Sequence, residues 1–456
     1  MMDFNKKIEE RISQILETKR EFNVLYVTDD TSRLACVRGY NAMQQFKQFY
    51  STIAEVTLTT MDSKTFCRTK PDLSGYSVVW VDNIISKQFN DLMMERMREA
   101  FNQVAPGWRE EAESLKGNQE EYDKYMKGAN EFRSLTLRVV YALDEFVWDA
   151  PAARNKTIIE AKLVADCLDY ADTIVVPNNE LRTAIVQLQL VAEDKDVVII
   201  PSFVSSYFYP THKVFLKSKG GFTTIRKPKI LVKGTDIPQN VQNLIIHGTD
   251  EYDFTISTVS ELDPRLMELL RPRSKKEGPL VRHVMHWANP YVTSKNSMET
   301  MAMERDAGFD FVLLTEPEHV DEDIYNITIA DTDAILAISS GSVVFAQIAE
   351  AGFEPGVHIC NECGKEFVFG QDTSVKELMA MLEKWRITVN WDEAYTKQRT
   401  LMEHRLVSDP KVLAGYFHSM LGRRVSTALK SKFDEGMAKL KKKEKEKEAE
   451  STSEGE

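Results

Sequence analysis

Short apolar runs alternate along the chain with longer stretches of helical periodicity. From Asn23 onward, six runs rich in β-branched residues follow one another: NVLYVT, EVTLTT, SVVWVD, RVVYAL, TIVVPN and VVIIPS. Continuous apolar runs of this length are typical of strands buried on both faces of a parallel sheet. Strands alternating with helices predict a doubly wound α/β sheet, in which ligands bind at the carboxyl ends of the strands.

The strand pattern restarts after a basic, glycine-containing stretch, KVFLKSKGGFTTIRKPK. The later runs read KILVKG, DFTIST, LVRHVMHW, DFVLLTE and AILAIS, and helices are expected from Val375 onward. Two consecutive doubly wound sheets predict two domains that face across a cleft, which is the default place for a ligand. The predicted boundaries are a leading helix at 1–20, a first domain at 21–210 with a helical insertion at about 84–132, a linker at 211–228, a second domain at 229–425, and a charged helix with a disordered tail at 426–456.

Composition narrows the possible classes of protein. The 456 residues carry a net charge of -12, so the chain as a whole lacks the positive field of a typical nucleic-acid binder. Five cysteines are too few, and odd in number, for a disulfide framework, which indicates a reducing compartment. No apolar run approaches the roughly 20 residues that span a bilayer. We therefore expect a soluble, cytoplasmic protein.

An ordered set of segments resembles glycosyltransferases of the GT-B fold, in which two Rossmann-like domains face across a cleft. VLYVTDDTSRLACVRGYNAM is similar to the opening strand, loop and helix of these enzymes. The later segments that resemble them are YSVVWVDN, RVVYALDEFVWDAP, LDYADTIVVPNNELRTAI with VVIIPSFVSSYFYP, KPKILVKG, and the stretch from TEPEHVDED to EPGVHI. Together the resemblance covers most of the chain between Asn23 and Leu421.

The resemblance implies a hexosyltransferase-type activity. The second domain would bind a nucleotide-sugar, and the first would bind an acceptor, which is a glycan, a protein or a small molecule. No metal or other cofactor is implied, because helix dipoles and basic side chains stabilise the leaving diphosphate. Two alternatives stay open: a catalytically silent GT-B scaffold with a binding or assembly role, and an enzyme that glycosylates nucleic-acid bases. The net charge of -12 argues against the second of these.

Acidic and basic residues at two strand ends of the first domain are candidates for chemistry. Asp144 and Glu145 stand where the resemblance places an acidic strand end, and Asp30 lies in the loop TDDTSR. A carboxylate there would act as general base or orient a sugar hydroxyl. Arg33 and Arg38 would contact phosphate or acceptor, and the alternative for this loop is a local salt-bridge cluster.

The donor site is predicted in the second domain. Ser339, Ser340, Gly341 and Ser342 stand between the expected strand AILAIS and the expected helix VVFAQIAEAG, so N–H groups at the helix start would bind a diphosphate. The alternative is a serine N-cap with a glycine in the turn. The remaining donor-binding candidates are Lys233, Thr315, Glu316 and Gln347, with the base expected near Thr315 to Val320.

Two features of the second half bear on donor chemistry and on metal binding. Retaining GT-B enzymes commonly carry two glutamates eight residues apart, and the matching positions here are Ser339 and Gln347. Donor identity and activity therefore stay open. His358, Cys360 and Cys363 have metal-like spacing, but no fourth ligand follows at a suitable distance, so we predict no metal site.

Overall fold

A computed structural model provides the structure of the protein. It describes residues 2–17, 20–29, 47, 54–143, 161–192, 195–201, 227–234, 237–258, 261–273, 278–283, 307–315, 332–347, 363–370, 372–386, 388–403, 410–428 and 431. The predicted linker at 211–228 lies almost wholly outside these residues, so the boundary between the two predicted domains stays a prediction.

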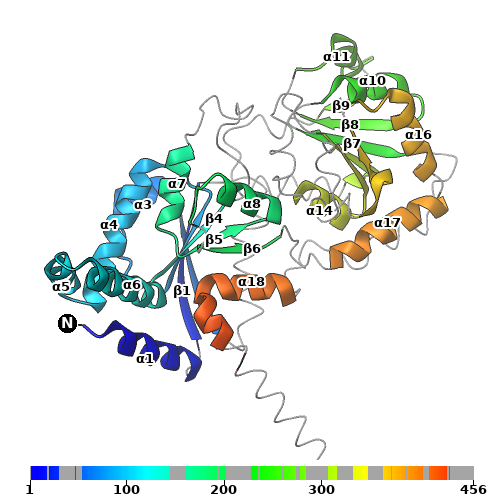
Figure 1. The fold of residues 1–456 in the computed structure, drawn as a ribbon. Helices are drawn as coiled ribbons and strands as arrows, with labels where there is room; N and C mark the ends of the chain where they lie inside the picture. The colour runs from blue at the N-terminus through cyan, green and yellow to red at the C-terminus, as the bar shows by residue number, and fades with distance from the viewer. Residues whose placement is uncertain are drawn as a thin grey trace, which may run out of the picture.

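Two six-stranded sheets organise the chain (Figure 1). The strand order is β2-β1-β3-β4-β5-β6 in the first sheet and β12-β11-β10-β7-β8-β9 in the second. The first sheet consists of β1 (Arg20–Thr28), β2 (Ala54–Met61), β3 (Val78–Asp82), β4 (Arg138–Ala142), β5 (Thr173–Val176) and β6 (Asp196–Ile199). The second consists of β7 (Lys229–Gly234), β8 (Asp253–Ser257), β9 (Arg282–His283), β10 (Phe311–Thr315), β11 (Val343–Gln347) and β12 (Val368–Phe369).

Every strand pair in the two sheets is parallel. This confirms the predicted α/β class with two doubly wound sheets. The helices are α1 (Phe4–Glu17), α3 (Ser63–Thr69), α4 (Lys87–Val104), α5 (Trp108–Leu115), α6 (Gln119–Thr136), α7 (Ala161–Asp169), α8 (Asn179–Gln187), α10 (Gln239–Gly248), α11 (Pro264–Leu269), α14 (Thr332–Ser339), α16 (Val375–Arg386), α17 (Thr388–Glu403) and α18 (Pro410–Leu421). A short 3-10 helix spans Lys365–Phe367.

Alternate side chains of the first sheet belong to two separate cores. Val24, Tyr26 and Trp80 pack with side chains of α1, α5, α6 and α18 on one face. On the other face, Leu25 and Val79 pack with side chains of α3, α4, α7 and α8. A parallel sheet with both faces covered explains why its strands read as unbroken apolar runs.

The predicted helical insertion at about 84–132 forms α4, α5 and most of α6, with a turn at Ala105 to Gly107. It packs against the leading helix. Phe4 of α1 contacts the rings of Phe101, Tyr125 and Phe132, at centroid distances of 6.3, 5.1 and 5.9 Å. The insertion therefore covers a face of the sheet and builds part of its core.

The second sheet follows the predicted strands up to β10, and then the prediction is wrong. AILAIS belongs to the helix α14, and VVFAQ forms the strand β11. An apolar run of this length does not distinguish a buried strand from a buried helix. The types of residue do distinguish the two segments. AILAIS contains two alanines and a leucine, which favour a helix, whereas VVFAQ is dominated by β-branched and aromatic residues, which favour a strand.

The small-residue segment Ser339 to Ser342 therefore ends a helix. The N–H of Ser342 donates to the carbonyl of Ala337 at 3.2 Å, and the N–H of Gly341 donates to the carbonyl of Ile338 at 3.0 Å. This is the Schellman pattern, and Gly341 adopts the left-handed conformation that it requires, with φ of 89°. The hydroxyl of Ser342 donates to the carbonyl of Phe309, a residue just before β10. The segment therefore lies at the amino edge of the sheet.

Helix α18 packs on the first sheet, although it follows the whole second sheet in sequence (Figure 1). Tyr416 stacks on Trp80 of β3 with ring centroids 5.5 Å apart. The buried guanidinium of Arg138, at the start of β4, donates to the carbonyl of Ser419 at 2.8 Å. Helix α18 therefore packs with the first sheet, although its residues fall within the range 229–425 that was predicted for the second domain.

An ion-pair cluster fixes this helix to the amino edge of the first sheet. The carboxylate of Asp196, at the start of β6, lies 3.0 Å from His418 Nε2 and 3.4 Å from Arg138 Nη2. Burial by itself would raise the pKa of Asp196, but the hydrogen bond and charge of His418 and the charges of Arg138 and Arg423 outweigh it, so the pKa lies below its ordinary value.

Gly341→Ala is expected to destabilise the second sheet by about 1–2 kcal/mol, because an alanine in the left-handed region is strained. Urea unfolding of the full chain measures the change. Gly278→Ala is the control, because Gly278 has no such φ and a Cβ there meets nothing within 4 Å. Equal effects of the two substitutions would contradict the helix-end assignment.

Stability that Asp196 contributes is expected to be lost in acid. A carboxyl whose folded pKa is depressed stabilises the fold above its unfolded pKa of about 3.9, and this contribution disappears as the pH falls through the folded pKa. The difference in unfolding free energy between the wild type and Asp196→Asn should therefore be largest near neutral pH and should shrink below about pH 4. The exposed Asp91→Asn serves as control. A difference that does not change with pH would contradict the role given to this carboxylate.

Candidate functional site

The strand order places a switch point in each sheet. In the first sheet β1 and β3 are neighbours, while β2 lies beyond β1 and β4 lies beyond β3. In the second sheet β7 and β10 are neighbours, with β8 and β11 on opposite sides. Connections leave such a strand pair in opposite directions, which opens a crevice at the carboxyl ends where ligands of doubly wound sheets bind.

A buried carboxylate lies at the switch point of the first sheet. Asp82, the last residue of β3, is 4% exposed. It accepts hydrogen bonds from the hydroxyls of Tyr26 and of Thr28, the latter at 3.3 Å, so it links the ends of β3 and β1. A carboxylate fixed in this way is suited to accept a hydrogen bond from a substrate hydroxyl or to take its proton.

Asn83 turns the chain sharply immediately after Asp82. Its φ is 52°, in the left-handed region that asparagine tolerates better than most residues. Its N–H donates to the carbonyl of Ala142 at 2.9 Å, and its enclosed Oδ1 accepts no hydrogen bond within the described structure. The hydroxyl of Tyr141 donates to the carbonyl of Ile84, and burial raises the pKa of Tyr141 well above its ordinary value, which keeps it a donor. The turn is therefore held from β4.

Asp29, directly after β1, is tied to the neighbouring helix. Its carboxylate accepts from the N–H of Ser63 at 2.7 Å and also from the Ser63 hydroxyl. The salt-bridge cluster that is the alternative for this loop stays a prediction, because Asp30, Arg33 and Arg38 lie outside the described residues.

Six of the predicted site residues lie outside the described residues: Asp30, Arg33, Arg38, Asp144, Glu145 and Glu316. Leu143 immediately precedes two of them and is the last described residue after β4. Its N–H donates to the carbonyl of Val175 at 2.9 Å, which continues the sheet pairing up to that point. The catalytic assignments of Asp30, Asp144 and Glu145 stay predictions.

At the switch point of the second sheet, two of the predicted donor residues come together. Thr315 ends β10 and pairs with Gly234, the last residue of β7, while Lys233 pairs with Leu314. The Thr315 hydroxyl lies 3.5 Å from the carbonyl of Lys233. Gln347 ends the adjacent strand β11 and is 3% exposed, so it lies on the same carboxyl edge. Lys233, Thr315 and Gln347 therefore share one edge.

The ammonium of Lys233 is buried and ion-paired. Its side chain is 3% exposed, and its Nζ lies 2.7 Å from Asp333 Oδ1, whose side chain is 36% exposed. Asp333 belongs to the first turn of α14, so this contact places the N-terminus of α14 at the carboxyl edge. The first N–H groups of a helix have no partner within the helix, and they carry partial positive charge.

The site predicted at Ser339 to Ser342 needs correction. Ser339, Ser340, Gly341 and Ser342 close the C-terminus of α14 at the amino edge, and the hydroxyls of Ser339 and Ser340 donate to the carbonyl of Leu336. Their N–H groups therefore do not begin a helix at the carboxyl edge. Ser339 and Gln347, the positions that match the two glutamates of retaining GT-B enzymes, also lie at different edges of the sheet. Ser339 ends α14, whereas Gln347 ends β11.

Sequence reasoning did not single out Asp82, Asn83 and Asp333. For the first two a signal was present, because an acidic residue followed by asparagine ends the apolar run SVVWVD. For Asp333 almost no sequence signal was present, because its partner Lys233 lies 100 positions earlier.

Metal-ligating groups do not gather in the described part of the chain. No group of three or more His, Cys, Asp or Glu side chains there is arranged to bind a metal ion. Cys363 is buried, whereas His358 and Cys360 lie outside the described residues. As for membranes, none of the described helices has the length and apolar content needed to cross a bilayer.

Comparison with known proteins gives structural neighbours only. No protein-family model matches the chain, and neither does any curated protein sequence. Sucrose-phosphate synthase from Thermosynechococcus elongatus is 10% identical, covers 91% of this chain and 99% of its own, and has a TM-score of 0.45. HepE from Anabaena, in complex with UDP and glucose, is 12% identical over 88% of this chain and 100% of its own, with a TM-score of 0.46.

A third neighbour is an alpha,alpha-trehalose-phosphate synthase (UDP-forming) from Burkholderia vietnamiensis. It is 10% identical, covers 90% of this chain and 98% of its own, and has a TM-score of 0.43. These identities and TM-scores are low, so the two-sheet architecture rests on the strand pairing of this chain itself.

Proposed function

We propose that the protein is a nucleotide-sugar-dependent glycosyltransferase of the GT-B type, with the donor bound by the second sheet and the acceptor by the first. The observation that carries the proposal is the buried Lys233 at the switch point of the second sheet, in contact with the N-terminal turn of α14. A cation beside the open N–H groups of a helix is an arrangement that binds phosphate.

The proposed diphosphate site is the first turn of α14, in place of Ser339 to Ser342. The N–H groups of that turn would donate to the phosphate oxygens, and Lys233 would supply a charge-assisted hydrogen bond. Asp333 balances the charge of Lys233 in the free protein and holds the lysine at the edge. Thr315 and Gln347, at the ends of the two adjacent strands, are proposed to contact the rest of the donor.

The proposed acceptor site is the crevice between the ends of β1 and β3. Asp82 would accept a hydrogen bond from the reacting hydroxyl, and Asp30, Asp144 and Glu145 remain the predicted carboxylates beside it. In the transfer step the acceptor oxygen bonds to the anomeric carbon, whose bond to the diphosphate oxygen breaks. The hydroxyl proton passes to a carboxylate, and Lys233 and the α14 N–H groups stabilise the charge on the leaving diphosphate.

A silent scaffold is the second candidate function, and one observation favours it. The ammonium of Lys233 already has a carboxylate partner at 2.7 Å, so a phosphate would have to compete with Asp333 for it. A protein that kept this edge closed would retain the fold without donor binding. That the proposed reaction needs no cofactor stays a prediction.

Donor binding is tested by calorimetric titration of the full chain with millimolar nucleoside diphosphates and their sugars, UDP-glucose included. We expect at least one nucleotide to bind, and Lys233→Met to weaken its binding about tenfold to a hundredfold through loss of one charge-assisted hydrogen bond. The exposed Lys376→Met is the matched control in the same half of the chain. Thermal unfolding of each variant confirms that it is folded.

Two results would count against this assignment. Binding of no nucleotide by the wild type would favour the scaffold. Unchanged binding by a folded Lys233→Met protein would place the donor elsewhere.

Asp82→Asn is expected to lower the rate of sugar transfer, or of donor hydrolysis, by about a hundredfold or more, as loss of a general base does. The donor dissociation constant should stay the same, because Asp82 belongs to the other sheet. Asparagine keeps an oxygen that can accept from Tyr26, so the fold is preserved. Exposed Asp91→Asn is the control for charge. If Asp82→Asn changed donor affinity and left turnover intact, the role proposed for Asp82 would be wrong.

A further inference from the structure

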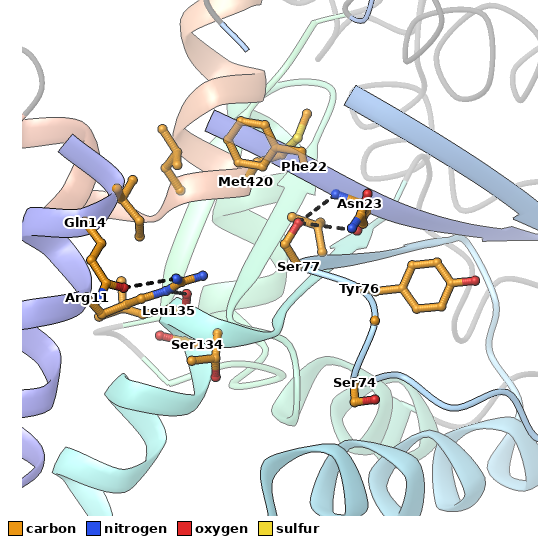
Figure 2. Close-up of a pocket in the computed structure, with 15 residues that line it drawn as sticks. Arg11, Gln14, Phe22, Asn23, Ser74, Tyr76, Ser77, Ser134, Leu135 and Met420 are labelled. Carbon is orange, nitrogen blue, oxygen red and sulfur yellow. Dashed lines mark hydrogen bonds between the residues drawn. The ribbon is translucent and has the colours of Figure 1, made fainter. Parts of the chain in front are cut away.

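A hollow of about 470 Å³ lies at the amino edge of the first sheet, the edge opposite the switch point (Figure 2). Its size falls within the range of about 300–1,000 Å³ typical of small-molecule sites. The walls come from α1, the start of β1, the loop before β3, the end of α6 and the end of α18. Segments far apart in the sequence therefore build one hollow.

The hollow combines an apolar wall with a polar rim. Phe22, Val78, Met420 and Leu421 are buried core residues that also line it. Asn23 and Ser77 add polar groups, with the backbone N–H of Asn23 donating to Ser77 Oγ at 2.9 Å, as the dashed lines of Figure 2 show. The surface that these residues expose to the hollow is more polar than apolar, which suits a ligand that carries both polar and apolar groups.

Charge distinguishes this hollow from the rest of the chain. The protein carries a net charge of -12, yet none of the 15 residues that line the hollow is acidic, and one is Arg11. The guanidinium of Arg11 reaches only neutral acceptors among the described residues: the Leu135 carbonyl and Gln14 Oε1, both at 3.4 Å. These contacts are long, so the cation retains donors for an anion.

A neighbouring hollow of about 650 Å³ shares Arg11, Gln14 and Tyr76 with the first and adds Lys7. Lys7 lies one turn before Arg11 on α1, with its ammonium 5.4 Å from the centre of the Phe132 ring. Like charges at this spacing on a helix repel each other, and a bound anion would relieve the repulsion. Glu10 also lines this second hollow, and it pairs with Lys6 at 3.9 Å.

We propose that the hollow at Arg11 binds a small amphipathic anion. Its apolar part would pack against the edges of Phe22, Met420 and Leu421 that reach the hollow, and its carboxylate, sulfate or phosphate group would pair with Arg11. Because α1 and α18 both contribute walls, the bound molecule bridges these two helices and stabilises the packing of α18 on the first sheet. This site is independent of the donor and acceptor sites at the carboxyl edges.

The test uses anilinonaphthalene sulfonate, an anionic amphiphile whose fluorescence rises in apolar surroundings, with the full chain. We expect saturable binding at one site, weakened about tenfold or more by Arg11→Gln through loss of a charge-assisted hydrogen bond. Lys6→Gln, an exposed change on the same helix, should alter affinity by less than about twofold, as surface charges do. The uncharged analogue N-phenylnaphthylamine should bind more weakly and should not respond to Arg11→Gln.

Gly75→Leu supplies a second variant that changes no charge. Gly75 lines the hollow, and a Cβ there meets nothing within 4 Å, so the fold has room for the leucine, whose side chain we expect to occupy part of the hollow. Gly75→Leu should abolish probe binding. If Arg11→Gln does not fold, the result with Gly75→Leu tests the proposal by itself. The proposal is overturned if the wild type shows no saturable binding, if a folded Gly75→Leu protein binds the probe as the wild type does, or if the uncharged analogue binds equally tightly.

Discussion

Parallel strand pairing is the constraint on which the rest of the structure depends. Because every strand pair in both sheets is parallel, all carboxyl ends of one sheet meet at a single edge, and each connection must cross a face of the sheet, usually as a helix. This rule brings Asp82 beside Thr28 in the first sheet and Lys233 beside Thr315 in the second. It also places the N-terminus of α14 at the carboxyl edge and its serine-rich C-terminus at the amino edge.

The two edges of the first sheet have different roles. At the carboxyl edge, hydroxyls and carboxylates end the strands next to a sharp turn at Asn83, an arrangement suited to chemistry. At the amino edge, Arg138, Asp196 and His418 fix α18, and the neighbouring hollow is lined without a carboxylate. Breaking a buried ion pair is costly, so the cluster holds α18 in one position. The last described helices of the chain thereby become part of its first core.

Much of the fold follows from local sequence, and most of the site does not. The runs NVLYVT to VVIIPS predict all six strands of the first sheet, because β-branched residues in buried strands leave a clear pattern. AILAIS misleads because a short apolar run fits a buried helix equally well. The pair of Lys233 and Asp333, and the return of α18, depend on contacts between residues far apart in sequence. Local periodicity carries no information about such contacts.

The central claim is that the first turn of α14, beside Lys233, binds the donor diphosphate. Hydrogen–deuterium exchange of the full chain, with and without UDP-glucose and the corresponding ADP-, GDP- and CDP-sugars, tests it most directly. The account predicts slower exchange of the amides at 332–334 with at least one of these donors, because phosphate oxygens would accept from N–H groups that the helix leaves open. Protection confined to 339–342, or no protection with any donor, would contradict it.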